Sequence, residues 1–198
     1  FLRHAAEQSG QICSYSNIAQ DSGLSHTTVK AYFEILESTL LADRIEPITH
    51  SKTRKKLVRS PRYLFFDMGV RRLAARESID PPQSVKGHLF EHWIGLEILK
   101  YIRSHKLSAT LHFWQDPEVA EVDWVVQVNK IFLPFEIKIK NNVAKGDLRH
   151  LEHFLKEYPC PHGGFVIFTG LRPQKLTETI TAIPWQNLTK MLEEFVKK

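Results

Sequence analysis

The stretch EVDWVVQVNKIFLPFEIKIK, residues 121–140, predicts the element around which the second half of the chain folds. Apolar side chains occupy every odd position from 131 to 139, as expected for a β-strand with one face on a core. Asn129 and Lys130, between two β-prone runs, suit a two-residue hairpin turn. We therefore predict a hairpin of strands over residues 120–128 and 131–140.

This hairpin brings charged side chains together. If the turn has two residues, Val128 faces Ile131, and the same register places Asp123 directly opposite Glu136. Like charges at opposite positions are destabilising, and a divalent cation between them would offset the repulsion. Lys138 lies on the same strand face as Glu136. Two carboxylates and a lysine suit Mg²⁺-assisted phosphodiester hydrolysis, because hard oxygen ligands hold Mg²⁺ and leave room for water and phosphate. The alternative is a surface salt-bridge cluster.

A second candidate site lies in a helix predicted over residues 87–103. Its first part, GHLFEHW, residues 87–93, fits the H-x-x-E-H pattern of zinc peptidases, with His88 and His92 as ligands and Glu91 as general base. That hypothesis leaves the hairpin group unexplained. We therefore favour Glu91 as a helix carboxylate that reaches toward the hairpin, and we expect the two histidines to be exposed or beside the site.

The first 48 residues predict three helices. Ser25 is a good N-cap for the third helix, in which Val29, Phe33, Leu36 and Leu40 form an apolar stripe. A short turn containing glycine precedes it, and this layout is typical of a helix-turn-helix. The candidate DNA contacts near the start of the third helix are Ser25, Thr27, Thr28 and Lys30.

A basic linker follows. Two β-prone runs, residues 45–48 and 63–66, flank residues 52–62, and we predict a β-hairpin wing with a cationic tip over DNA phosphates. The candidate phosphate contacts at the tip are Lys52, Arg54, Lys55 and Lys56. A solvated basic loop, or a helix-turn-helix that binds protein, is the alternative. Next we predict a short helix over 67–75, with Arg71 and Arg72 exposed.

The break at residues 80–82, Asp-Pro-Pro, is the predicted domain boundary, giving domains 1–82 and 83–198. In the second domain, the pattern adds a strand over 110–115, a helix over 147–157, a strand over 164–169 and a helix over 185–196. The order is α-β-β-β-α-β-α. The predicted fold class is therefore α/β (α+β), with a winged helix-turn-helix before a mixed-sheet domain.

Composition sets looser bounds. The 198 residues hold 27 Lys and Arg against 22 Asp and Glu, and the net charge of +5 permits a polyanionic partner without requiring one. Two distant cysteines give no disulfide framework that would indicate export. No apolar run approaches the roughly 20 residues of a membrane helix. We expect a cytoplasmic protein without membrane contact, and the start at Phe1, inside a predicted helix, suggests the C-terminal piece of a longer one.

Asp123, followed by Glu136-x-Lys138 and preceded by a helix bearing Glu91, resembles the PD-(D/E)xK nuclease superfamily, whose domains are restriction-endonuclease-like. The wider pattern over residues 14–172 resembles a C-terminal domain of unknown function. That domain follows an AAA-type ATPase module in many bacterial and archaeal proteins, with a winged helix between the two. Val122 stands where the superfamily motif has proline, which makes the match less specific.

The resemblance implies a metal-dependent endonuclease. Glu91, Asp123 and Glu136 would bind Mg²⁺ or Mn²⁺, and Lys138 would be the catalytic lysine. The partners would be DNA and the ATPase module of the same protein, which alone would bind ATP; self-association stays open. The alternative is a non-catalytic DNA-binding or protein-interaction region with a vestigial nuclease fold.

Overall fold

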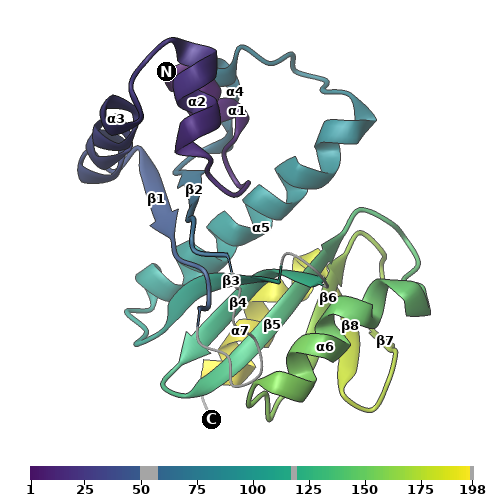
Figure 1. Cartoon of the computed structure of the whole chain (residues 1–198). Helices are drawn as coiled ribbons and strands as arrows, with labels where there is room; N and C mark the ends of the chain where they lie inside the picture. Colours follow the sequence, from purple (N-terminus) through teal and green to yellow (C-terminus); the bar gives the residue numbers. More distant parts are fainter. Residues whose placement is uncertain (50–57, 117–119, 197–198) are drawn as a thin grey trace. The chain divides into compact units, whose positions relative to one another are not determined.

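The computed structural model describes residues 1–49, 58–116 and 120–196. Over these residues the fold is mixed α/β, with seven α-helices and a six-stranded mixed sheet (Figure 1). The chain forms two compact units. The first is Phe1–Glu46 with Ser60–Leu96, and the second is Pro47–Arg59 with Glu97–Lys198. The domain boundary predicted at residues 80–82 stays a prediction.

Within its described residues, the first unit holds helices close to the predicted ones, but the helix predicted over 87–103 begins earlier, at Gln83. The helices are α1 (Leu2–Glu7), α2 (Tyr15–Ser22), α3 (His26–Ser38), α4 (Met68–Ala75) and the first part of α5 (Gln83–Ser104). Ser14, Ser25 and Asp67 cap α2, α3 and α4 through their side chains, which satisfies backbone N–H groups of the first turn. The second and third predicted helices are therefore present as α2 and α3, and their assignment as a helix-turn-helix stays a prediction.

The stripe on α3 is confirmed for three of its four residues. Val29, Phe33 and Leu36 are buried in the core of the first unit. Leu40 is 78% exposed, because α3 ends at Ser38 and the Leu40 backbone is left-handed, with φ 60°. Arg71 of α4, predicted to be exposed, is buried and pairs with Glu77.

The first unit also holds a two-stranded antiparallel sheet, β1 (Ala42–Ile45) and β2 (Arg62–Phe65). The strand predicted over 45–48 was wrong in its bounds. Ile48 belongs to the second unit, where its N–H donates to the carbonyl of Phe113 at 2.8 Å, and the Val58 N–H donates to Gln115 at 3.3 Å. The physical reason is that Phe113 and Gln115 lie on an edge strand, whose backbone groups bond readily to another segment. The predicted tip residues Lys52, Arg54, Lys55 and Lys56 lie outside the described residues.

The six-stranded sheet of the second unit has the order β3-β4-β5-β6-β8-β7. Its strands are β3 (Thr110–Asp116), β4 (Ala120–Val128), β5 (Ile131–Lys138), β6 (Gly164–Phe168), β7 (Gln174–Lys175) and β8 (Ile180–Pro184). The β3–β4, β4–β5 and β7–β8 pairs are antiparallel, and the β5–β6 and β6–β8 pairs are parallel. The sequence did not predict β7 and β8, because β7 has two residues and β8 is short and ends at a proline.

Helices cover both faces of this sheet. The 3₁₀ helix η1 (Lys145–Leu148) leads into α6 (Arg149–Glu157) on one face, and η2 (Trp185–Asn187) leads into α7 (Leu188–Val196) on the other (Figure 1). Leu148, Leu151 and Phe154 pack with Val166 and Phe168 of β6. The side of β5 opposite its odd-numbered residues is therefore covered as well, which buries Glu136. None of the described helices combines the length and hydropathy that a membrane span requires.

Candidate functional site

The β4–β5 hairpin follows the predicted register up to the edge of the candidate site. Val128 faces Ile131 across the turn, and Asn129 takes a left-handed backbone with φ 55°. The paired register ends at Trp124 and Phe135, one position before Asp123 and Glu136. The hairpin itself is therefore confirmed, and a local irregularity determines how Asp123 is placed.

That irregularity is a β-bulge in β4. Where β3 and β4 pair, one residue of β3, Phe113, faces two residues of β4, Asp123 and Trp124. Bulges bend a strand and can redirect a side chain. Here the Asp123 Oδ2 accepts a hydrogen bond of 2.7 Å from the backbone N–H of Ile137 on β5. The Asp123 carboxylate thus accepts the hydrogen bond that a backbone carbonyl of β4 would accept if the β4–β5 pairing continued.

Glu136 and Lys138 complete the group. The Lys138 Nζ donates to the Glu136 Oε1 at 2.7 Å. Asp123 is 7% exposed and Glu136 is 4% exposed, whereas the Lys138 side chain is 29% exposed. Buried carboxylates are costly unless they are paired or hydrogen-bonded, so this is not a cluster of surface charges. The structure brings together three of the predicted catalytic residues.

The segment between β5 and α6, which includes η1, adds groups that the sequence did not indicate. The Lys140 Nζ donates to the Asp147 Oδ2 at 2.5 Å, and the Ala144 N–H donates to the same oxygen at 2.8 Å. Burial opposes ionisation of Asp147, but these two hydrogen bonds and the charges of Lys140 and Lys138 lower its pKa below the usual value. Asp147 therefore lies within electrostatic reach of the candidate lysine.

His150 lies on α6, three residues after Asp147 of η1, and is half-buried. Its ring donates a hydrogen bond to the backbone carbonyl of Glu121, two residues before Asp123. Burial lowers the pKa of His150, and the charge of Lys138 lowers it further. The spacing of three from Asp147 and of four from buried Phe154 is the signal that could have placed His150 toward the sheet.

Glu91 lies on α5 in the first unit, half-buried. Its Oε2 is 3.4 Å from the Nδ1 of His88, and the His88 side chain is 57% exposed, in agreement with prediction. The role of Glu91 as a further carboxylate of the hairpin group stays a prediction.

His92 differs from the prediction, because it is fully buried in the first unit. Its Nε2 donates to the carbonyl of Phe65 at 3.2 Å, and its Nδ1 lies 3.5 Å from the Ser9 Oγ. Burial lowers the pKa of His92 to about 4. Because both ring nitrogens face core partners, His92 is not placed to bind zinc, and the H-x-x-E-H hypothesis fails at this residue.

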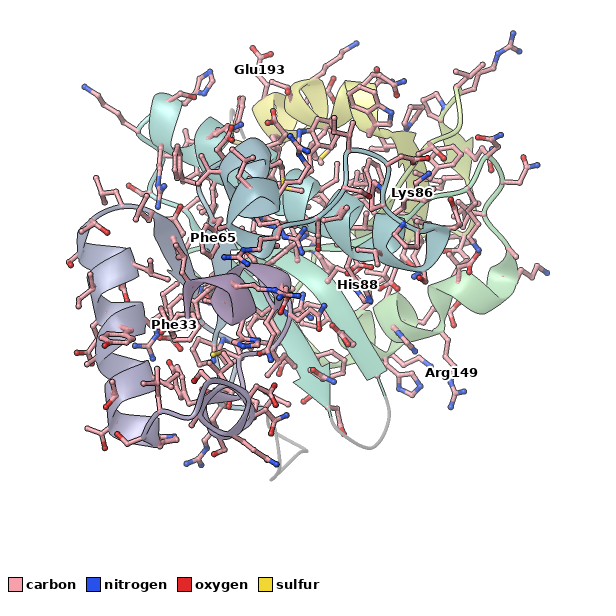
Figure 2. The ribbon with its side chains drawn as sticks, turned by 90° about the horizontal axis from the view of Figure 1, so that it is seen from above. Phe33, Phe65, Lys86, His88, Arg149 and Glu193 are labelled. Carbon is pink, nitrogen blue, oxygen red and sulfur yellow. The ribbon has the colours of Figure 1, made fainter. Side chains whose placement is uncertain are left out.

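The predicted DNA contacts on α3 divide into two kinds. Ser25 and Thr28 are engaged locally, because the Ser25 Oγ accepts from the Thr28 N–H at 3.1 Å and lies 2.8 Å from the Thr28 Oγ1. Thr27 and Lys30 are exposed. Phe33 of the same helix points into the core of the first unit and is labelled in Figure 2.

Among residues 1–49, 58–116 and 120–196, no group of three or more His, Cys, Asp or Glu side chains is arranged to hold a metal ion. The pair Asp123 and Glu136 offers two carboxylates. Mg²⁺ is commonly held by one or two protein carboxylates, with water and phosphate as the other ligands, so the donor chemistry of the pair fits it.

On the opposite face of the sheet, a cavity of about 330 Å³ lies beside α7. Leu133, Phe165 and Ile183 of the sheet line it, together with Lys190 and Met191 of the helix. None of the predicted site residues that the structure describes lines this cavity. It is therefore separate from the Asp123 group.

Comparison with known proteins gives families without an assigned function. Residues 86–188 match the family described as "Domain of unknown function (DUF4143)", and residues 1–80 match "Domain of unknown function (DUF8612)". No curated protein matches. Among solved structures, the crystal structure of protein VC1899 from Vibrio cholerae is similar, with 14% sequence identity and a TM-score of 0.38 over 99% of this chain. This chain covers 50% of the length of that protein.

Proposed function

We propose, from the premise that this chain belongs to the DUF4143 family, that its second unit is a nuclease-like domain that hydrolyses DNA phosphodiester bonds with a divalent metal. One observation supports this function above the others: buried Asp123 and Glu136 lie beside Lys138 on adjacent strands. In this proposal the fold is a winged helix followed by a PD-(D/E)xK nuclease-like domain.

The residues have distinct tasks in the proposed reaction. Asp123 and Glu136 would hold Mg²⁺ or Mn²⁺, which when bound would activate a water and offset charge on the phosphate. The Ile137 N–H keeps the Asp123 carboxylate oriented. Lys138, partly exposed, can transfer its hydrogen bond from Glu136 to a phosphate oxygen and stabilise negative charge that develops there.

The first unit would bring DNA to this domain. Exposed Thr27 and Lys30 at the start of α3 are the proposed contacts, with Ser25 and Thr28 fixing the end of the helix. An AAA-type ATPase module of the same protein is the proposed intramolecular partner, as the sequence resemblance implies.

A specific observation favours a second function, that of a non-catalytic interaction region. The Ile137 N–H already bonds to Asp123, and the Lys138 ammonium already bonds to Glu136. Carboxylates with partners inside the protein gain less from binding a metal. A vestigial nuclease fold would keep this arrangement for stability.

Metal titration and DNA cleavage distinguish the two functions. We would measure Mg²⁺ and Mn²⁺ binding by calorimetry and cleavage of plasmid DNA for the full chain, Asp123→Asn, Glu136→Gln and Lys138→Met. The expected loss of cleavage is about 100-fold or more for each variant, the size typical of removing a group that stabilises the transition state. Metal affinity should fall in the two carboxylate variants.

Glu152→Gln is the matched control, because Glu152 is an exposed carboxylate of α6 in the same unit. It should cleave DNA and bind metal like the unchanged chain. If the unchanged chain neither binds metal nor cleaves DNA, the non-catalytic function is the right one.

A further inference from the structure

The segment from Lys138 to His150 is strongly cationic. It carries four Lys and Arg residues against one acid, Asp147, and Lys140 forms an ion pair with that acid. Lys138 faces Glu136. Lys145 and Arg149 remain, and neither forms an ion pair within the described part of the chain.

Two hydrogen-bonded residues hold this segment in place. Asp147 accepts from Lys140 and from the Ala144 N–H, and His150 is bonded to the backbone of Glu121 on β4. Leu148, between them, is buried in the core of the second unit. Lys145 and Arg149 therefore project from a fixed backbone.

Their position is beside the candidate site. Lys140, two residues after Lys138, donates to Asp147 at 2.5 Å, and Asp147 is two residues from both Lys145 and Arg149. Lys145 and Arg149 are both exposed, and Figure 2 shows the Arg149 side chain extending outward from the ribbon. Neither side chain is buried in the core or paired with an acidic residue in the described part of the chain.

The rest of α6 has the opposite character. Beyond Arg149 and His150, the helix carries Glu152, already in its first turn, and Glu157, with one further lysine, Lys156. A polyanion beside this helix is thus attracted to its start and repelled further along. Exposed Lys156 provides an internal comparison, because it carries the same charge on the same helix without the neighbouring cations.

We infer that Lys145 and Arg149 bind two consecutive phosphates of a nucleic-acid backbone, and so guide the strand past Asp123, Glu136 and Lys138. The inference rests on the proposed nuclease function and adds a substrate-binding track in the second unit, independent of α3. The planar guanidinium of Arg149 can hold a phosphate with two hydrogen bonds, and Lys145 supplies a point charge.

The experiment measures how DNA binding depends on salt, without divalent metal so that the probe stays intact. A short fluorescein-labelled DNA duplex is titrated with the full chain at several NaCl concentrations, by anisotropy. The double variant Lys145→Ala/Arg149→Ala should lower the magnitude of the slope of log Kd against log salt by about 1.8, because each phosphate contact contributes about 0.9. Lys156→Ala should leave the slope unchanged.

An unchanged slope in the double variant overturns the inference, and so does an equal fall in Lys156→Ala. Circular dichroism checks that both variants fold, which is expected because all three positions are exposed. A separate assay with Mg²⁺ tests cleavage by the unchanged chain. Absent cleavage with a lowered slope in the double variant would refute the nuclease function while supporting the phosphate contacts.

Discussion

His92 is held in the core of the first unit by its hydrogen bond to the Phe65 carbonyl, and its other ring nitrogen lies 3.5 Å from the Ser9 Oγ. The Ser9 Oγ near it also donates to the Tyr63 carbonyl and accepts from the Phe65 N–H. Gly10 lies so close that a Cβ there would be 3.3 Å from the Cβ of His92. Because the imidazole is fully buried, its positive charge would be poorly solvated, and this has a measurable effect on stability.

The first unit should lose stability as the pH falls from 6.5 toward about 4. The unfolded chain takes up a proton on His92 below its usual pKa of 6.5, whereas the folded chain does so only near 4. The unfolded state therefore binds more protons in this range, and the full difference is about 3 kcal/mol. Urea unfolding followed at several pH values measures it.

His92→Gln is the comparison for this effect. It should be less stable than the unchanged chain at neutral pH, because it disturbs the core, and its stability should depend less on pH in that range. Equal pH dependence in the two proteins would show that another group is responsible.

The sequence predicted the placement of single side chains best where the alternation along one strand determines it. Alternation along residues 131–139 was enough to bring Glu136 and Lys138 to one face, and the two-residue turn brought Asp123 near them. His92 and Arg71 were misjudged, because their burial depends on which distant segments pack over them. The bulge at Asp123 could not be predicted from the sequence of β4 either, because it arises where β4 pairs with β3.

The turn before β6 is an element on which the parallel part of the sheet depends. Gly163 has a left-handed backbone with φ 75°, and a Cβ at this position would lie 2.1 Å from the carbonyl oxygen of Thr179. The next residue, Gly164, donates its N–H to that same oxygen at 2.9 Å. A side chain would therefore break the link between β6 and the segment leading to β8.

Gly163→Ala should destabilise the second unit by about 2 kcal/mol or more, through backbone strain and the clash with Thr179. Gly146→Ala, where a Cβ has no neighbour within 4 Å, should change stability by less than about 0.5 kcal/mol. Thermal unfolding of both variants beside the unchanged chain measures the difference. Equal stabilities would mean that this turn can rearrange.

Elements with strong local signals were predicted well. The capping residue Ser25 and regular apolar spacing located α3, and the hairpin turn located β4 and β5. The wing was predicted less well, because Ile48 has a β-forming side chain but pairs with a strand more than 60 residues away, Phe113 of β3. β8 was not predicted because its strand conformation depends on pairing with β6, which its own sequence does not indicate.

At the scale of the whole molecule, the chain passes between the two units three times, near residues 46, 59 and 96. Ile48 is buried in the core of the second unit although residues on both sides of its segment belong to the first. The second unit is therefore not a continuous stretch of sequence. Boundary signals such as the Asp-Pro-Pro break at 80–82 cannot reveal this, because composition carries no information about long-range pairing.

Ile48→Ala should destabilise the second unit by about 2 to 5 kcal/mol, the usual loss for a buried isoleucine. Hydrogen exchange of backbone amides in β3, β4 and β5 should become faster in proportion. Ile79→Ala is the control, because Ile79 is 86% exposed and its loss should leave these amides unaffected. Faster exchange confined to the first unit would contradict the assignment of Ile48.

The anchoring of Ile48 and Val58 on β3 also bears on how such a protein can change during evolution. The match to DUF8612 ends at residue 80 and the match to DUF4143 begins at residue 86. Ile48 and Val58, which bond to the edge strand β3, therefore lie within the DUF8612 match, whereas β3 itself lies within the DUF4143 match. A recombination event between residues 80 and 86 would replace the N-terminal part of the chain and remove the residues that bond to the edge of β3. Stable recombinants must bring a replacement segment, and substitutions at Ile48 and Val58 must remain compatible with their neighbours on β3.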